Sequence, residues 1–315
     1  MTRPTITVVG AGQVGATTAH LLLLKQLADV VLIDVVDGLA AGKALDLLQA
    51  AAADDLDVRV TGATDYAAMA GSRIVVVTAG LARKPGMSRD DLLSANANIV
   101  GPIAEQIARH APEAVVVVVT NPLDVMTYLA FKRTGFPRRR VMGMAGVLDT
   151  SRLRAFIAQR LSVPPARVAA TVLGSHGDLM VPVVSSITVG GKPITSLLPA
   201  DEVEQLLART RDGGAEIVKL LKQSSAYYAP AGGVAQMIQA IVRDERRVLP
   251  VAAVLDGEYG LRDVCIGVPA ELGSGGIARV VEPPLAEADR AALQAAANQV
   301  RGMITQLFTR DSQRA

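Results

Sequence analysis

Short, continuously apolar runs alternate with longer helix-forming stretches along the first 146 residues of the chain. These runs are rich in valine and isoleucine, and they lie at residues 5–9, 30–34, 58–61, 73–78, 114–120 and 141–144. Runs without polar alternation are typical of strands buried on both faces of a parallel sheet. Because the runs alternate with helices, this half is predicted to be an α/β fold with a doubly wound parallel sheet, the Rossmann arrangement.

The pattern changes near Gly146, although no linker rich in proline or serine marks the place. Residues 181–189 predict a strand that enters a hairpin at Gly190 and Gly191. Helices are predicted at 146–161, 200–222, 226–243 and from about 285, with antiparallel strands near 248–254 and 264–266. The second half is therefore predicted to be α+β, and the domains to be residues 1–146 and 147–315.

Composition and charge narrow the class of protein. Half of the 315 residues are hydrophobic, and 32 basic residues nearly balance 30 acidic ones without a long block of one charge. Such a balance argues against a surface for nucleic acid or membrane, and the cluster Arg138–Arg140 is expected to be a solvated loop. The single cysteine, Cys265, excludes an internal disulfide and a thiolate metal cage, so we expect a cytoplasmic protein without a metal site.

A glycine-rich turn follows the first predicted strand and opens a helix. Its six residues are Gly10, Ala11, Gly12, Gln13, Val14 and Gly15. In this context G-x-G-x-x-G indicates dinucleotide binding, because the first glycine makes the tight turn, the second admits a pyrophosphate and the third lets helix and strand pack closely. The free N–H groups at the start of the helix then face the phosphates.

An acidic residue ends the second predicted strand. Asp34 lies nineteen residues after Gly15, where a carboxylate can accept the ribose hydroxyls of an adenosine and repels a 2′-phosphate. The cofactor is therefore predicted to be NAD rather than NADP. The alternative is that Asp34 only caps the following helix.

The ends of the fourth and fifth predicted strands are further candidates, because ligands of such sheets bind beyond the carboxyl ends of the strands. Asn121, held by Pro122, could present its amide to the nicotinamide or to the substrate; a simple Asn-Pro turn is the alternative. The loop 81–91 leaves the fourth strand at this edge and carries Arg83 and Arg89. We interpret it as a lid that closes over an anion, rather than as a solvated loop with scattered charges.

Three histidines are present, and only His176 lies between glycines with an acid two residues later. Imidazole can accept and return a proton near neutral pH, although a satisfied structural histidine is the common alternative. Asp149 and Arg152 share one face of the predicted helix 146–161. We expect Asp149 to hold the imidazole in one tautomer and Arg152 to grip a carboxylate in bidentate fashion, although a local surface ion pair would also fit.

The glycine turn, Asp34, Arg83–Arg89, Thr120–Pro122, Leu148–Arg152 and Gly174–Asp178 together resemble the lactate/malate dehydrogenases, and among them the lactate-dehydrogenase-like malate dehydrogenases of prokaryotes. The resemblance follows nearly the whole chain in the order of the family. One small departure is Ser224, where similar sequences are expected to have glycine. The resemblance implies a homodimer or homotetramer.

The resemblance also implies roles for the residues that match. His176 would be the proton acceptor and Asp149 its partner, while Arg152 would bind the C1 carboxylate and Arg89 would polarise the C2 oxygen. Arg83 would stand where lactate enzymes have glutamine and malate enzymes arginine. Residues expected at the cofactor and at the place where cofactor and substrate meet are Asn96, Val119, Thr120 and Asn121.

A physical argument agrees with the resemblance on the substrate. An arginine enclosed without an anion costs several kcal/mol, so three arginines around one small pocket favour a dicarboxylate over a monocarboxylate. We therefore predict NAD-dependent oxidation of malate to oxaloacetate, a step of the tricarboxylic acid cycle. The alternatives are a lactate or other 2-hydroxyacid dehydrogenase, an NAD-dependent glycosidase, for which Cys265 lacks a metal-binding partner, and a non-catalytic dinucleotide sensor.

Overall fold

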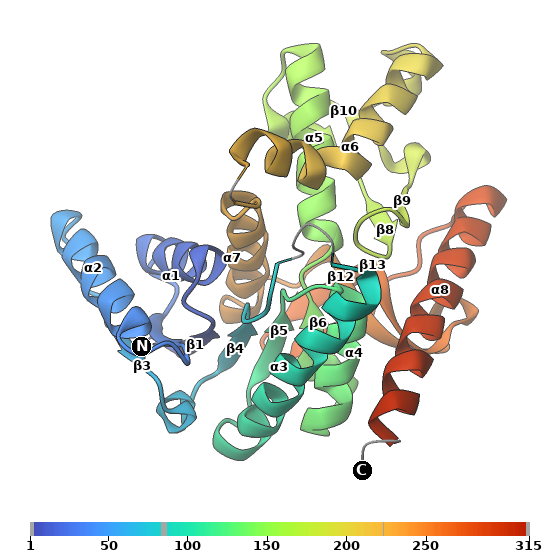
Figure 1. The fold of residues 1–315 in the computed structure, drawn as a ribbon. Coiled ribbons are helices and arrows are strands. Elements are labelled where there is room, and N and C mark those ends of the chain that lie inside the picture. Colours follow the sequence, from blue (N-terminus) through green and yellow to red (C-terminus); the bar gives the residue numbers. More distant parts are fainter. Residues whose placement is uncertain (1–2, 83–86, 223, 313–315) are drawn as a thin grey trace.

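The computed structural model describes residues 3–82, 87–222 and 224–312. Six parallel strands form one half of a large sheet in the order β3-β2-β1-β4-β5-β6 (Figure 1). Their bounds are β1 Thr5–Val9, β2 Asp29–Ile33, β3 Val60–Ala63, β4 Ile74–Val77, β5 Val115–Val118 and β6 Val141–Gly143. This order confirms the doubly wound sheet. The chain adds strands on one side of β1 as far as β3 and then on the other side from β4 onward, and such sheets bind ligands at the point between β1 and β4 where this change occurs.

Helices cover both faces of the parallel strands. The first four are α1 Gln13–Leu24, α2 Leu39–Ala53, α3 Arg89–His110 and α4 Leu123–Thr134. Helices α3 and α4 pack together, while α1 contacts both α2 and the later helix α7, Tyr228–Val242. In Figure 1, α1 and α2 lie at the left and α3 and α4 at the lower front.

The second half extends the same sheet in the antiparallel sense. Strand β12, Arg247–Asp256, pairs with β6, and β13, Arg262–Gly273, pairs along the length of β12. Strands β8 Val172–Gly174, β9 Met180–Pro182 and β14 Gly276–Val280 complete the sheet. The sheet is therefore continuous across residue 146, and the predicted division into two domains does not coincide with a break in hydrogen bonding.

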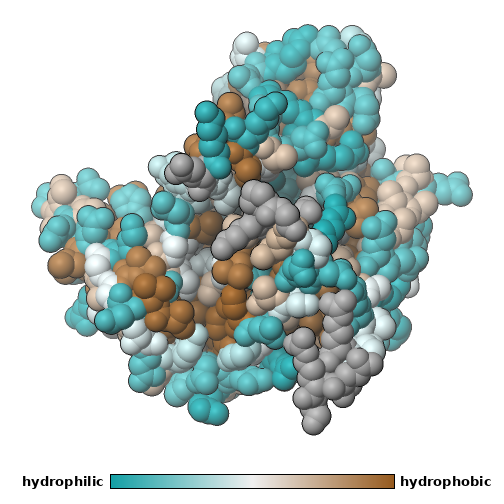
Figure 2. Space-filling view, viewed as in Figure 1, coloured by the Kyte–Doolittle hydropathy of each residue, from teal (hydrophilic) through white to brown (hydrophobic). Residues whose placement is uncertain are grey.

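A smaller lobe stands above the sheet and consists of α5, Gly146–Leu161, α6, Ala200–Leu221, and a three-stranded sheet (Figure 1). Its strands are β7 Val168–Ala169, β10 Thr188–Val189 and β11 Lys192–Pro193. Helix α8, Glu287–Ser312, runs along the right edge of the molecule in Figure 1, on the side away from α2. Figure 2 shows mainly hydrophilic side chains over the upper lobe, with apolar side chains below it toward α1 and α2.

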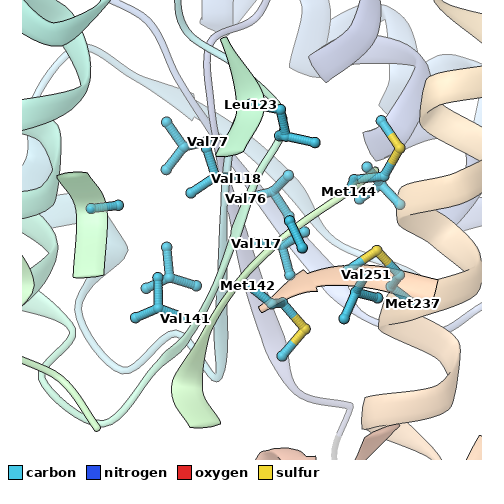
Figure 3. Close-up of a cluster of buried hydrophobic side chains, with 14 of the residues drawn as sticks. Val76, Val77, Val117, Val118, Leu123, Val141, Met142, Met144, Met237 and Val251 are labelled. Carbon is cyan, nitrogen blue, oxygen red and sulfur yellow. The ribbon is translucent and has the colours of Figure 1, made fainter. Parts of the chain in front are cut away.

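The main hydrophobic core runs through both halves of the chain. Figure 3 shows part of it, where Val76 of β4 and Val117 of β5 lie beside Met142 of β6, Met237 of α7 and Val251 of β12. All five side chains have no exposed surface. The valine-rich runs are thus strands buried on both faces, as predicted.

The strands predicted at 58–61 and 181–189 differ from those observed. The third strand begins at Val60 rather than Val58 and extends through Gly62, because it pairs in register with β2 and because Gly62 lies directly against the backbone of Ala40. The run Val181–Val189 is broken by a turn of 3₁₀-helix, in which Ser186 accepts a hydrogen bond from the backbone of Thr171. The hairpin at Gly190 and Gly191 is confirmed, and both glycines have positive φ.

Candidate active site

The glycine turn has the geometry predicted for a pyrophosphate cradle. Gly10 has φ +103°, and a Cβ at Gly15 would stand 1.8 Å from the Gly10 carbonyl oxygen. Gly12, in contrast, has open space around its Cβ position within the described chain. Gly12 is also the N-cap of α1, and within the described residues this helix end has no side-chain cap hydrogen bond. The N–H groups of its first turn fit a phosphate group that approaches Gly12.

Asp34 lies at the end of β2, beside this turn. Its Oδ2 accepts a hydrogen bond from the Ala11 N–H at 2.7 Å, and its Oδ1 accepts one from the Val36 N–H at 3.0 Å. Helix α2 begins later, at Leu39, with Gly38 as its N-cap. Asp34 is therefore not the cap of that helix, and each of its oxygens keeps a lone pair that could accept a ribose hydroxyl.

Asn96 joins the loops that follow β4 and β5. Its side-chain amide donates to the carbonyl oxygens of Leu81 and Asn121 and accepts from the Leu81 N–H at 2.7 Å. Asn96 has no exposed surface, so its placement supports a role in holding these two loops together. Thr120 has a similar position, since its hydroxyl donates to the Ala79 carbonyl oxygen at 2.7 Å. Contact of Asn96, Val119 or Thr120 with the cofactor stays a prediction.

His176 lies in the loop between β8 and β9 and contacts an acid on α5. Its Nδ1 is 2.9 Å from Oδ2 of Asp149, which is 1 % exposed. A carboxylate accepts hydrogen bonds, so Nδ1 carries the proton and Nε2 of a neutral ring is left as the acceptor. Arg152 donates through Nη1 to the other Asp149 oxygen at 3.4 Å. The Asp149–Arg152 pair is thus buried and is not the surface pair considered above.

Burial and charge act in opposite directions on these groups. Burial alone would lower the pKa of His176, but the charge and hydrogen bond of Asp149 outweigh it and raise the pKa above 6.5. Burial lowers the pKa of Arg152, with a partial offset from Asp149. The Arg152 Nε is buried and has no hydrogen-bond partner in the described part of the chain. Its guanidinium therefore has donors left for an anion.

The two glycines around His176 have different functions. A Cβ at Gly174 would lie 2.5 Å from the Leu179 carbonyl oxygen, so this glycine serves the packing of the β8–β9 hairpin. Gly177 has φ +104° with open space around its Cβ position in the described structure. Only Gly177 therefore matches the expectation that a glycine admits a bound molecule to the loop.

Three of the predicted substrate-site residues line one pocket of about 240 Å³, namely Arg89, Asn121 and His176. Arg89 begins α3, directly after Ser88, which forms a capping box with Asp91. Its guanidinium binds Asp178, and both side chains are about three-quarters exposed. Arg83 lies outside the described residues. Arg152 and Asp149 do not line the pocket; Arg152 contacts Asp149, which in turn contacts His176.

The pocket also contains residues to which the sequence assigned no role, among them Asp124, Ser175 and Met303. Asp124 lies in the first turn of α4, Ser175 precedes His176, and Met303 comes from α8. A signal for Asp124 was available, because it is the only charged residue in the mainly apolar stretch 122–131. That signal gave no indication of what Asp124 would contact.

Comparison with known proteins identifies the family to which the chain belongs. Residues 5–143 match the model of the lactate/malate dehydrogenase NAD-binding domain, and residues 146–310 match that of the family's alpha/beta C-terminal domain. The chain is 52 % identical over 304 residues to a malate dehydrogenase of Desulforudis audaxviator, covering 96 % of this chain and 98 % of the relative. It is 55 % identical over 297 residues to one of Chloroherpeton thalassium, covering 94 % and 96 %.

Solved structures agree with this likeness. The malate dehydrogenase of Salinibacter ruber superposes with a TM-score of 0.94 at 44 % identity, covering 99 % of this chain and 100 % of that one. A lactate dehydrogenase of Cryptosporidium parvum, complexed with lactic acid and NAD, superposes with a TM-score of 0.94 at 37 % identity, covering 98 % of both chains. The chain belongs to the lactate/malate dehydrogenase family.

Proposed function

We propose that the chain is an NAD-dependent malate dehydrogenase that catalyses the reversible oxidation of (S)-malate to oxaloacetate. The observation that carries the proposal is the buried contact of His176 with Asp149, whose other oxygen binds Arg152. This group adjoins a pocket that also holds Arg89 and Asn121. The relatives that are more than half identical to this chain, and are malate dehydrogenases, support the same function.

His176 performs the proton transfer. Asp149 fixes the proton on Nδ1, so Nε2 can take the hydroxyl proton of malate and return it to oxaloacetate in the reverse direction. NAD, when bound, accepts a hydride from C2 of the substrate. Because the pKa of His176 is raised, oxidation requires a pH above that pKa, and reduction requires the protonated ring below it.

The arginines bind the carboxylates and the C2 oxygen of the substrate. Arg152 has an unused Nε and takes the C1 carboxylate, while Arg89 exchanges its exposed pairing with Asp178 for the C2 oxygen. An exposed ion pair is worth at most about 1 kcal/mol, so this exchange costs little. Arg83 takes the second carboxylate, an assignment that comes from the sequence. Asn121, with an exposed side chain in the same pocket, orients substrate and cofactor.

The carboxyl ends of the parallel strands would hold NAD. Backbone N–H groups at Gly12 and the start of α1 would bind its pyrophosphate, while Gly10 makes the turn and Gly15 lets helix and strand pack closely. Asp34 would accept hydrogen bonds from the adenosine ribose. The carboxylate would repel a 2′-phosphate, which makes NAD the preferred cofactor. Binding of NADP that is tighter than binding of NAD would contradict this assignment.

We also propose a homodimer or homotetramer in the cytoplasm, acting in the tricarboxylic acid cycle. Large apolar side chains on and before α2 support association, since Val36, Leu45 and Leu48 are each 45–56 % exposed. No helix in the described ranges is both long and apolar enough to cross a membrane. Sedimentation of the purified protein would give its mass, and a monomer at micromolar concentration would contradict the assembly.

A lactate dehydrogenase is the remaining alternative, because the Cryptosporidium parvum structure of that name superposes closely at lower identity. Oxidation of NADH with oxaloacetate and with pyruvate separates the two. We expect kcat/KM for oxaloacetate to exceed that for pyruvate by about 100-fold or more, since pyruvate leaves one arginine without its anion. Equal values, or a preference for pyruvate, would reject the malate assignment.

The variant His176→Asn is the control for the chemistry in this assay. It should bind NADH with unchanged affinity and lose turnover by about three orders of magnitude or more, because asparagine cannot take the hydroxyl proton. Turnover close to that of the natural chain would remove His176 from the mechanism.

A further inference from the structure

A second buried carboxyl lies beneath the histidine loop. Asp124, in the first turn of α4, is 3 % exposed. Its Oδ2 accepts a hydrogen bond from the Ser175 hydroxyl at 2.6 Å and one from the His176 backbone N–H at 3.3 Å. Both contacts are made across about fifty residues of sequence, so Asp124 fixes the loop from outside.

The two oxygens of Asp124 have different surroundings. Oδ2 takes both hydrogen bonds, whereas Oδ1 is buried and has no hydrogen-bond partner among the described residues. A proton can therefore sit on Oδ1 without breaking either contact to the loop. Loss and gain of this proton change the charge beneath His176 while the anchoring hydrogen bonds stay in place.

The titratable groups that face Asp124 come from several elements. His176 faces it from the loop after β8, Asp149 from α5 and Cys265 from β13. Burial raises the pKa of Asp124 to about 6, even though the Ser175 hydrogen bond and His176 lower it. The remaining charges of the pocket, on Arg89, Asp90 and Asp178, are exposed, and solvent screens them.

We propose that Asp124 is a positioning residue for proton transfer, which anchors the loop at Ser175 and His176 and stabilises the cationic imidazole as a second negative charge beside Asp149. The proposal rests on the function assigned above to His176. Hydrogen bonding alone does not require a carboxylate, because a neutral asparagine could accept from the same hydroxyl and N–H. The charge is what distinguishes aspartate here, since an opposite charge nearby favours the protonated imidazole.

Ring-proton NMR of the three histidines tests the proposal without reference to activity. Loss of one signal in His176→Asn assigns His176, and its pKa is then measured in the natural chain and in Asp124→Asn. We expect the asparagine variant to lower the pKa of His176 by about 0.5 to 1 unit, because one negative charge is lost. The natural chain should show a second, smaller inflection near pH 6, absent from the variant.

Asp55→Asn is the matched control, because Asp55 is exposed and far along the sequence from the pocket, and asparagine tolerates its positive φ. It should leave the pKa of His176 unchanged. Ser175→Ala keeps the carboxyl group of Asp124 and removes one anchoring bond. It should lower kcat and hold the pKa of His176 above that in Asp124→Asn.

Kinetics provide the second measurement. The acid limb of malate oxidation and the alkaline limb of oxaloacetate reduction should both move to lower pH in Asp124→Asn, by the shift that NMR gives. An unchanged pKa of His176 in this variant, or a shift equal to that in Asp55→Asn, would overturn the proposal. Should Asp124→Asn fail to fold, a Ser175→Ala variant with an unchanged kcat and an unchanged pKa of His176 would overturn it. Failure of the proposed function appears separately, as turnover in His176→Asn.

Discussion

Asp124 is ionised at neutral pH although it is 3 % exposed, and this places a pH-dependent cost on folding. Its pKa rises from the usual 3.8 to about 6 in the folded chain, so the folded state binds the proton more tightly than the unfolded state. Stability from this group is therefore highest at low pH and falls as pH rises through both values.

The variant Asp124→Asn isolates that cost. Relative to the variant, the natural chain should lose about 2 kcal/mol of unfolding free energy between about pH 4.5 and pH 7.5. Urea unfolding of both proteins across this range provides the measurement. A difference that stays constant with pH would mean that Asp124 has an ordinary pKa in the folded chain.

The same residue marks the limit of what single residues in the sequence can predict. His176, Asp149 and Arg152 were predicted as one group, because residue type, helical spacing and flanking glycines each pointed to chemistry, and the structure brings them into contact. Asp124 lies in the first turn of a helix, where an acid is common for electrostatic reasons alone. Its burial depends on Ser175, fifty-one residues away, and no local pattern reports that contact.

At the scale of elements, the turn between β1 and α1 depends on two glycines for different reasons. A Cβ at Gly15 would collide with the Gly10 carbonyl oxygen, whereas a Cβ at Gly12 would point into open space in the described chain. Gly15→Ala should therefore destabilise the fold by about 2 kcal/mol or more. Gly12→Ala should change stability by less than about 1 kcal/mol and weaken NAD binding about tenfold or more.

Thermal unfolding and NADH fluorescence titration of the two variants test this division. Equal loss of stability would show that the collision at Gly15 is relieved by a shift of the helix. Unchanged NADH affinity in Gly12→Ala would mean that the pyrophosphate does not approach Gly12, and would move the cradle elsewhere.

Elements were predicted well where local signals and long-range pairing agree. Strand β1 and helix α5 have their predicted bounds. The β-branched run of β1 ends at a glycine turn, and α5 ends where its periodic pattern ends. Strand β3 is displaced by two residues, since pairing with β2 selects Val60–Ala63 and accepts Gly62 inside a strand. The run Val181–Val189 looks continuous, but its two ends belong to different sheets. The bounds of these strands depend on the strands they pair with, and the local sequence does not show which strands those are.

At the scale of the whole molecule, one continuous sheet runs through both predicted domains. Strand β12 of the second half pairs with β6 of the first, through Ala252 with Gly143 and Ala253 with Met142. The main core includes residues of both halves, such as Val117 and Val251. The change of pattern near residue 146 was visible in the sequence, but this pairing across it was not.

Because the two halves share a sheet and a core, a ligand bound to the first half is expected to stabilise the second half as well. NAD at about 100 times its Kd should add about 2.7 kcal/mol to the unfolding free energy and raise the melting temperature by about 5 °C. Calorimetry should show a single transition that moves as a whole, because separation at residue 146 would expose the paired edges of β6 and β12. NADP should raise the melting temperature less, since Asp34 repels its 2′-phosphate. Two transitions, of which NAD moves only one, would show that the halves unfold independently despite their shared sheet.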